Sequence, residues 1–269
     1  MTFLGAGIGY RRAHRAALLG GPRPRVLELM PDHFFGDPAS IEALAEQHHI
    51  VFHDVGLSLG TAGDAGWARP RLTRIRELVA RARPLLFSEH LALTRDPQGV
   101  ELGHLAPLWR NEEQLSLLVE RVQALQDVLG VPIALENIAA PFDIPGGMPE
   151  PEFFAELVRR SGCGVALDVT NLLLTARNQG FDAAERLREY PLEAVRQVHL
   201  AGGYRDDQEV WVDSHSEPVE EEAFALLAEL GRARGSLLTI IVERDDKLGS
   251  LDVLLAEARR AELIWEGLG

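Results

Sequence analysis

Residues that can bind metal ions end or closely follow short apolar runs at many points of this chain. One example is "VHLAGG", which holds His199 and is followed, after a short loop, by Asp213 and His215. With similar positions elsewhere, these residues form a set of four histidines, four carboxylates and one amide: His53, His90, Glu136, Asp168, Asn171, His199, Asp213, His215 and Glu243. Imidazole and carboxylate ligands without thiolate suit iron, zinc or manganese.

These side chains would conflict electrostatically if they met without a cation. Crowded carboxylates and imidazoles shift one another's pKa values strongly, and divalent ions remove that conflict. A carboxylate such as Glu136 can also bridge two ions, because each of its oxygens can coordinate separately. The set therefore predicts a site for two or three metal ions, provided that the fold brings its members together.

Each residue taken singly also has a purely structural explanation. His53 could make a hydrogen bond in a core. Glu243 could form a buried ion pair with Arg244, and Asp168 could cap a helix that begins near Asn171. Only convergence at one place distinguishes a metal site from these alternatives.

The elements that must position the ligands follow from hydrophobic periodicity. Eight short apolar runs recur along the chain: "LGAGIG", "RVLELM", "HIVFHDVGL", "PLLFSEHLAL", "VPIALENIA", "GVALDVTNL", "VRQVHLAGG" and "LLTIIVERD". Segments with helical spacing lie between them, for example 67–83 and 111–130. Asn111 is placed as a helix N-cap, and Gly130 and Gly162 as C-terminal stops.

Buried strands alternating with helices predict an α/β protein with a parallel sheet. Eight such units in about 250 residues match a closed (β/α)8 TIM barrel, and an open doubly wound sheet is the alternative. No linker divides the chain, so we expect residues 1–269 to form a single domain. A TIM barrel delivers side chains at its strand ends to one carboxyl-terminal rim, where the predicted ligands would meet.

Composition narrows the classes of partner and chemistry. The formal net charge of -14 disfavours nucleic acid and anionic membrane surfaces. We find neither a signal-peptide pattern nor a membrane-spanning apolar run, and we expect a cytoplasmic protein. Cys163 is the only cysteine, which excludes a disulfide framework and a Cys-rich metal site within the chain. "GAGIGY" lacks the complete dinucleotide fingerprint, and no G-x-S-x-G motif is present.

The ordered motifs "FHDVGLSLG", "SEHLALT", "LENIA", "ALDVTNLL", "VHLAGG", "VDSH" and "VERD" closely resemble those of the multinuclear non-heme iron-dependent oxidative enzymes, the family of methanobactin biosynthesis protein B. The resemblance covers nearly the whole chain. It implies a xylose-isomerase-like TIM barrel that uses two or three iron ions, with O2 as co-substrate. The implied reaction oxidises a residue, typically a cysteine, of a ribosomally synthesised precursor peptide, often alongside a small leader-binding partner protein.

The same resemblance assigns the ligands to three ions. His53, His90 and Glu136 would hold one iron, and Glu136 would be shared with a second iron held also by Asp168, His199 and Glu243. Asn171, Asp213 and His215 would form a third site. One departure from the family pattern is Asp32-His33, where many members have a Glu-Asn pair.

Three residues are predicted to assist catalysis near the ligands: Asp54, Tyr204 and Asp245. Ligating imidazoles usually donate their second N–H to a carboxylate or carbonyl, and Glu89 and Asn137 are further candidates for such contacts. Tyr204 could instead reach the substrate.

A more distant resemblance links the chain to other divalent-metal TIM barrels, including endonuclease IV and sugar isomerases. In endonuclease IV the position that matches Asn171 is a histidine, and an amide is the poorer zinc ligand. The acidic composition also argues against a grip on DNA phosphates. A divalent-metal enzyme of this kind is therefore the alternative prediction.

Overall fold

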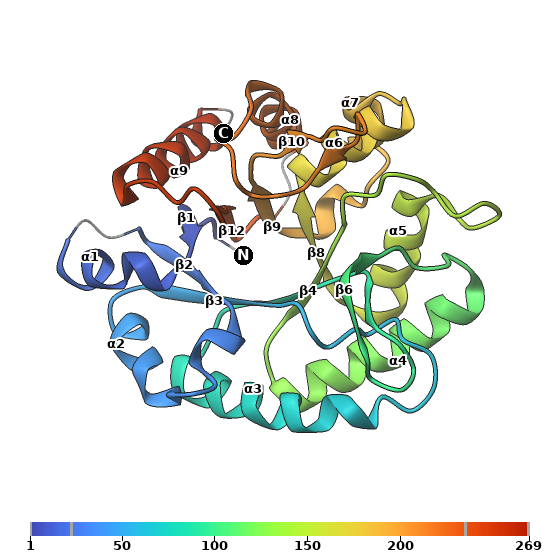
Figure 1. The fold of residues 1–269 in the computed structure, drawn as a ribbon, viewed down its shortest axis with the longest axis horizontal. Helices are drawn as coiled ribbons and strands as arrows, with labels where there is room; N and C mark the ends of the chain where they lie inside the picture. The colour runs from blue at the N-terminus through green and yellow to red at the C-terminus, as the bar shows by residue number, and fades with distance from the viewer. Residues whose placement is uncertain (1, 22–23, 234–235, 268–269) are drawn as a thin grey trace.

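Eight parallel strands close into a barrel in the computed structural model, which describes residues 2–21, 24–233 and 236–267 (Figure 1). Around the ring they are β1 (Ala6–Gly9), β2 (Val26–Leu29), β3 (His49–Asp54), β4 (Phe87–His90), β7 (Ile133–Glu136), β8 (Gly164–Asp168), β9 (Val195–Leu200) and β12 (Thr239–Val242). Each strand therefore pairs with the next barrel strand along the chain. The predicted TIM barrel is confirmed, and the open doubly wound sheet is excluded.

Helices surround the barrel (Figure 1). They are α1 (Arg15–Gly20), α2 (Glu42–Ala45), α3 (Arg69–Ala82), α4 (Glu112–Leu129), α5 (Glu150–Ser161), α6 (Val169–Gln179), α7 (Ala183–Leu187), α8 (Glu221–Arg232) and α9 (Leu251–Glu266). The predicted caps of α4 are confirmed: Asn111 accepts a hydrogen bond from the Gln114 N–H (2.8 Å), and Gly130 ends the helix with φ 66°. Gly162 ends α5 in the same left-handed conformation, with φ 75°. None of the helices within the described residues is long and apolar enough to cross a membrane.

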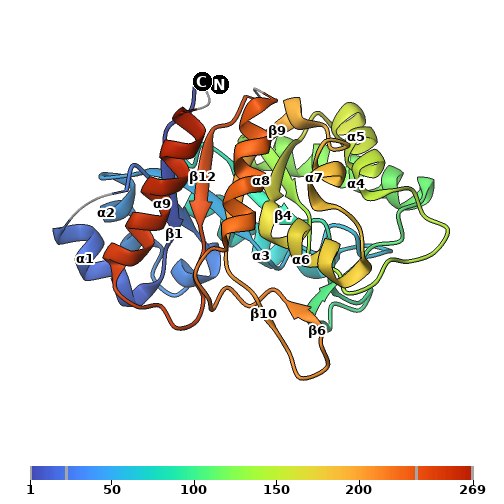
Figure 2. The same ribbon diagram turned by 90° about the horizontal axis from the view of Figure 1, so that it is seen from above.

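Two hairpins lie beyond the carboxyl ends of the barrel strands. One pairs β5 (Leu93–Arg95) with β6 (Glu101–Ala106), and the other pairs β10 (Tyr204–Arg205) with β11 (Trp211–Val212). In Figure 2, β9 and β12 point toward the edge of the molecule at which β6 and β10 lie. The hairpins therefore extend from the mouth of the barrel where its strands end.

The barrel interior is built in layers. A cluster of buried apolar side chains fills one layer: Val26, Val51, Leu86, Ala134, Ala166 and Ile241. Side chains of a strand alternate between its two faces, so the residue two positions later also faces inward, nearer the mouth. Those positions are polar: Glu28, His53, Ser88, Glu136, Asp168 and Glu243. The apolar layer thus forms a floor beneath a polar layer.

Two of the apolar runs in the sequence continue beyond the end of the barrel strand that each of them contains. In the run 84–93, β4 ends at His90 and Leu93 already belongs to the β5–β6 hairpin. In the run 164–172, β8 ends at Asp168 and α6 begins at Val169. The second run continues because the first turn of α6 is itself buried, with Leu172 only 2% exposed.

Candidate metal centre

Six of the predicted ligands converge inside the carboxyl-terminal mouth of the barrel. Each comes from a different strand or from the residue that follows it: His53 (β3), His90 (β4), Glu136 (β7), Asp168 (β8), His199 (β9) and Glu243 (after β12). All are buried except His90, whose side chain keeps 10% of its surface exposed. Barrel closure therefore brings together residues that are spread over 190 positions between 53 and 243.

The first group of donor atoms comes from His53, His90 and Glu136, and its members lie within 4.8 Å of one another. His53 Nδ1 is 3.4 Å from Glu136 Oε2, and His90 Nε2 is 3.9 Å from Glu136 Oε1. The two imidazole rings meet edge to face, with centroids 4.6 Å apart. Both oxygens of Glu136 thus have an imidazole nearby.

The second group shares Glu136 and adds Asp168, His199 and Glu243, again within 4.8 Å. His199 Nδ1 lies 3.2 Å from Glu136 Oε2 and 3.2 Å from Glu243 Oε2. Because Glu136 belongs to both groups, its carboxylate is placed to bridge two ions. The same residues make up the ligand sets that the family resemblance implies for two irons, and their role as ligands stays a prediction.

The remaining three predicted ligands adjoin the second group. His215 Nε2 lies 2.9 Å from Asp213 Oδ1, and His215 Nδ1 is 4.0 Å from Glu243 Oε2. Asn171 is in the first turn of α6, where its N–H donates to Asp168 Oδ1 (2.8 Å). Its side-chain N–H donates to the Asn137 carbonyl (3.2 Å), which leaves Asn171 Oδ1 available.

Buried polar atoms without partners test whether these residues suit a metal. Seven atoms of the predicted ligands lack a hydrogen-bond partner among the residues that the structure describes: His90 Nδ1, Glu136 Oε2, Asp168 Oδ2, Asn171 Oδ1, His199 Nδ1, Asp213 Oδ1 and His215 Nε2. An unpaired buried polar group costs about 1–3 kcal/mol, so native proteins rarely leave them in clusters. The donor set therefore fits a metal centre.

The separations between these atoms also suit coordination. Metal–ligand bonds of about 2.0–2.2 Å place neighbouring ligand atoms roughly 3 to 3.5 Å apart. Asp213 Oδ1 and His215 Nε2 are 2.9 Å apart without hydrogen-bond geometry, and His199 Nδ1 is 3.2 Å from two carboxylate oxygens. Close contacts that are not hydrogen bonds are typical of ligands around a shared cation.

The protein charges alone oppose one another in this site. Burial raises the pKa of Asp168 to about 8, and the charges of Asp213 and Glu136 contribute to the rise. Burial raises the pKa of Glu243 to about 8, against the lowering effect of His199. Burial also lowers the pKa of His53 to about 4. Against the effect of burial, Glu136 and Glu243 raise the pKa of His199 well above its usual value, and Glu243 and Asp213 do the same for His215. Carboxyls that retain protons and imidazoles that gain them show that the metal-free site takes up positive charge as protons, which a cation would replace.

Neighbouring polar groups hold two of the ligands in place. Asn137 pairs with both backbone groups of Asp168: its side-chain N–H donates to the Asp168 carbonyl (2.8 Å), and its Oδ1 accepts the Asp168 N–H (2.9 Å). Ser88 Oγ lies 2.9 Å from His53 Nδ1 and donates to the Phe52 carbonyl (3.2 Å). Asn137 thus holds the backbone of Asp168, whereas the predicted contact was with the second N–H of an imidazole.

The three predicted catalytic residues occupy different places. Asp245 contacts a ligand, since its Oδ2 is 3.0 Å from His215 Nδ1, and its other oxygen accepts from Arg11. Tyr204 lies on the β10–β11 hairpin with 45% of its surface exposed. Asp54 lies on the outer face of β3, because it follows the inward-facing His53, and the structure does not bring it into the donor groups.

Asp54 instead forms a buried ion pair with Arg71 of α3. Arg71 Nε donates to Asp54 Oδ2 (2.9 Å) and its Nη2 donates to Asp54 Oδ1 (2.5 Å) and to Asp32 Oδ1 (2.5 Å). Glu89 also faces outward and accepts the N–H groups of Leu57 (2.9 Å) and His90 (3.0 Å). These carboxylates hold the loops around the mouth.

The structural alternative for Glu243 fails. Arg244 pairs with Glu257 of α9 at 3.1 Å. The ion pairs of Glu243 within the described residues are with His199 and His215 only. The alternative for Asp168 holds in part, because this residue does cap α6, but only through Oδ1.

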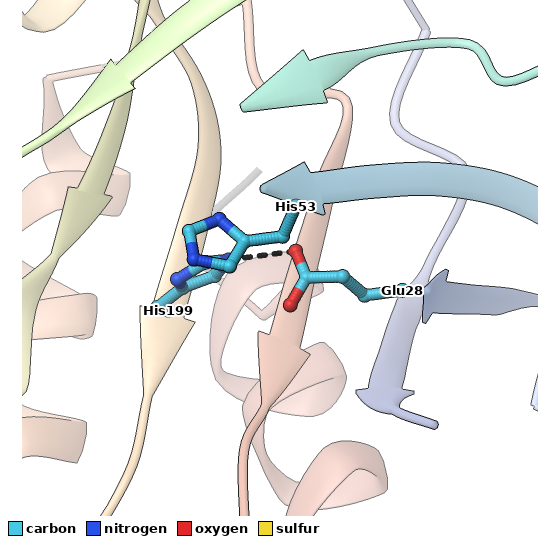
Figure 3. Close-up of side chains that lie close together, drawn as sticks. All are labelled: Glu28, His53 and His199. Atoms are coloured by element: carbon cyan, nitrogen blue, oxygen red, sulfur yellow. Dashed lines mark hydrogen bonds and ion pairs between the residues drawn. The ribbon is translucent and has the colours of Figure 1, made fainter. Parts of the chain in front are cut away.

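Glu28 is the residue that the sequence prediction missed. It lies inside β2 and is 2% exposed, and it forms a third close group with His53 and His199 (Figure 3). The prediction considered polar residues at the ends of apolar runs, whereas Glu28 interrupts the run "RVLELM". The alternation of Val26 and Glu28 on one face of the strand was the available signal.

Comparison with known proteins assigns the chain to a family. Residues 5–266 match the family described as RiPP precursor modification enzyme MbnB/TglH/ChrH. A protein of Caulobacter vibrioides strain NA1000 / CB15N, called a UPF0276 protein, is 34% identical over 270 residues that cover 98% of this chain and 95% of that protein.

Two solved structures show the same fold at low sequence identity. A xylose isomerase domain protein from Planctomyces limnophilus superposes with a TM-score of 0.59 at 16% identity, covering 99% of this chain and 98% of the other. Endonuclease IV from Thermus thermophilus gives a TM-score of 0.55 at 16% identity, with 98% of each chain covered. At this identity the likeness establishes a xylose-isomerase-like TIM barrel and nothing about the reaction.

Proposed function

Because the chain belongs to the MbnB/TglH/ChrH family of RiPP precursor modification enzymes, we propose that it uses iron and O2 to oxidise a residue of a ribosomally synthesised precursor peptide. The family assignment gives the broader function, which is modification of such a peptide. Iron, O2 and a cysteine as the oxidised residue belong to the proposal. So do a small leader-binding partner protein and a cytoplasmic location.

The proposal is supported most directly by seven buried ligand atoms at the mouth of the barrel that have no hydrogen-bond partner among the described residues. In the proposed assignment, His53, His90 and Glu136 hold one ion, and Glu136, Asp168, His199 and Glu243 hold a second. Asn171, Asp213 and His215 hold a third. Imidazole, carboxylate and amide donors without thiolate are compatible with iron.

When bound, iron would supply the activation of O2 and the acceptance of electrons from the substrate. The protein's own residues orient and shield the site. The apolar floor, which includes Val26, Val51 and Ile241, closes the barrel beneath the ligands. Asp245 accepts from His215 Nδ1–H, so that His215 Nε2 faces Asp213. We assign to Tyr204 contact with the peptide, and to Asp54 the positioning of the loop after β3.

The proposal is tested on protein purified without oxygen. We expect two or three iron ions per chain by elemental analysis, and O2 consumption when a cysteine-bearing precursor peptide is added. His90→Ala and Glu136→Ala should lose iron and O2 consumption together, because each removes a ligand of the first group. His49→Ala is the matched control, since His49 is exposed at the opposite end of the same barrel, at the start of β3.

Two results would contradict this function. Full activity of His90→Ala or Glu136→Ala would remove the assigned ligands from the mechanism. Turnover of a sugar or a DNA phosphodiester with Mg²⁺, Mn²⁺ or Zn²⁺ in the absence of O2 would instead support the alternative of a sugar isomerase or an endonuclease IV-like enzyme. Mass spectrometry of the peptide identifies the oxidised residue.

A further inference from the structure

Glu28 is a buried carboxylate whose only ion-pair partner among the described residues is a histidine. Its Oε2 lies 2.9 Å from His199 Nε2. Figure 3 marks the contact between Glu28 and His199 with a dashed line. The same oxygen accepts from the side-chain amide of Gln197, two residues earlier on β9. Glu28 is on β2 and its two partners are on β9, and the strands β1 and β12 lie between β2 and β9 in the ring. Glu28 therefore reaches across the barrel interior to His199.

The two nitrogens of His199 face different partners. Nε2 faces Glu28, whereas Nδ1 faces Glu136 and Glu243 of the second donor group and lacks a hydrogen-bond partner in the described part of the chain. A neutral imidazole carries one N–H and one lone pair. A carboxylate can only accept, so Glu28 requires the hydrogen on Nε2. The lone pair is then on Nδ1, where the carboxylate ligands lie.

We propose that Glu28 is a positioning residue that fixes the tautomer and the orientation of His199, so that Nδ1 is the nitrogen presented to the metal. The proposal rests on the metal centre of the proposed function but is independent of iron, O2 and the peptide. Carboxylates that accept the second N–H of a ligating histidine fix its ring and increase its basicity, and their loss typically costs about 10–100-fold in metal affinity.

Gln197 requires that the atom facing His199 Nε2 at position 28 be a hydrogen-bond acceptor. The Gln197 amide nitrogen lies 2.6 Å from His199 Nε2, and both nitrogens contact Glu28 Oε2. An amide nitrogen can only donate, so with a hydrogen on Nε2 both groups are donors, and the Glu28 oxygen is the acceptor that they share. Gln197 Oε1 is buried without a hydrogen-bond partner within the described residues, which indicates that the amide is oriented by its donor side. A glutamine at position 28 would therefore be expected to place its oxygen, not its N–H, toward His199.

Charge gives Glu28 a second effect on the centre. Glu136, Asp168 and Glu243 bring three negative charges to the second group when ionised, and Glu28 adds one more without being needed as a ligand. Two divalent cations would balance these four charges. The negative charge behind His199 would favour a more highly charged ion at Nδ1.

The test uses Zn²⁺ binding to the whole chain after removal of metal with a chelator. Glu28→Leu removes the acceptor and excludes water from its place, and should weaken the tightest Zn²⁺ binding by about 10–100-fold. Glu28→Gln keeps an acceptor oxygen and should lose about tenfold or less. Thr239→Val is the control, because it removes a buried hydrogen bond to the Gly5 carbonyl inside the same barrel without touching a ligand.

Nitrogen-15 NMR of the histidines in the Zn²⁺-loaded proteins gives a readout that stability does not affect. We expect His199 to be metal-bound at Nδ1 and protonated at Nε2 in the wild type and in Glu28→Gln, and to lose this pattern in Glu28→Leu. Zn²⁺ bound through His199 Nε2 in the wild type would overturn the proposal. So would wild-type affinity in Glu28→Leu, or the loss of one whole Zn²⁺ from both variants, which would make Glu28 a ligand.

Discussion

Asp168 uses its two carboxylate oxygens for different purposes. Oδ1 accepts the Asn171 N–H and caps α6, whereas Oδ2 is buried, unpaired within the described chain, and part of the second donor group. The helix position and the ligand position are therefore set by the same side chain. A substitution that preserves the cap separates the two roles.

Asp168→Asn should remove metal affinity without removing the cap. The folded-state pKa of Asp168 is raised from 3.8 to about 8 by burial, so its bound proton stabilises the metal-free fold fully below pH 4. That stabilisation is lost as the pH rises through 8. In urea unfolding of chelator-treated protein, the wild type should lose more stability than Asp168→Asn between about pH 6 and pH 9. Asp168→Ala should cost about 1 kcal/mol more than Asp168→Asn, through the lost cap. An equal pH slope in wild type and Asp168→Asn would contradict this account.

Metal binding should release protons from two carboxyls and from two imidazoles, because neighbouring carboxylates raise the pKa values of His199 and His215 well above the usual value. Burial raises the pKa of both Asp168 and Glu243 to about 8, and a metal ion needs their ionised forms. Zn²⁺ affinity should therefore rise by at least about tenfold between pH 6 and pH 7. Isothermal titration calorimetry in buffers of different ionisation enthalpy counts the released protons. Binding with no proton release at about pH 6 would show that the carboxyls and imidazoles have already lost these protons, and would contradict the raised pKa values.

At the scale of elements, the two faces of one strand carry residues with different roles: predicted metal ligands face inward, and residues that hold the surrounding helices face outward. On β3, His53 faces the ligands and Asp54 faces α3, where it pairs with Arg71. This ion pair holds the end of β3 against α3. Arg71 also forms an ion pair with Asp32, which lies in the short helix after β2. The network positions the loop that leaves β3.

Arg71→Met should destabilise the protein by about 3–5 kcal/mol, because it leaves Asp54 buried and unpaired. Asp54→Asn combined with Arg71→Met should recover much of that loss. Arg74→Met is a control on the same helix, since Arg74 donates to the Phe35 carbonyl and makes no ion pair with any described residue. Guanidinium chloride unfolding of the metal-loaded proteins measures the differences. If Arg71→Met lowers the free energy of unfolding by no more than Arg74→Met does, the ion pair between Asp54 and Arg71 contributes little to stability.

The sequence predicted the barrel strands and helix α4 well because their signals are local. Hydrophobic periodicity marked all eight barrel strands, and Asn111 and Gly130 marked the ends of α4. The β5–β6 hairpin was not predicted, because Leu93 extends the apolar run of β4 without any change in composition. Glu28 was missed because the prediction considered only the ends of apolar runs. Asp54 was placed beside the ligands because position at the end of a run does not tell which face of the strand a residue occupies.

At the scale of the whole molecule, the apolar floor and the polar ligand layer have separate sources of stability. The floor is held by burial of apolar side chains such as Val51 and Leu86, which needs no metal. The layer above it contains buried carboxyls and imidazoles whose charges the protein alone does not balance. Removal of metal should therefore weaken the mouth while the barrel persists.

Chelation should lower the melting temperature without unfolding the barrel. A ligand at about 100 times its Kd stabilises the folded state by about 2.7 kcal/mol, which corresponds to about 5–10 °C for a chain of this size. Calorimetry with and without chelator measures the shift, and far-ultraviolet circular dichroism should be unchanged at room temperature, because strands and helices are held by the apolar floor and the outer helices. Loss of the circular dichroism signal on chelation would mean that the cations, and not the apolar layer, close the barrel. In that case the layered interior would be a consequence of metal binding.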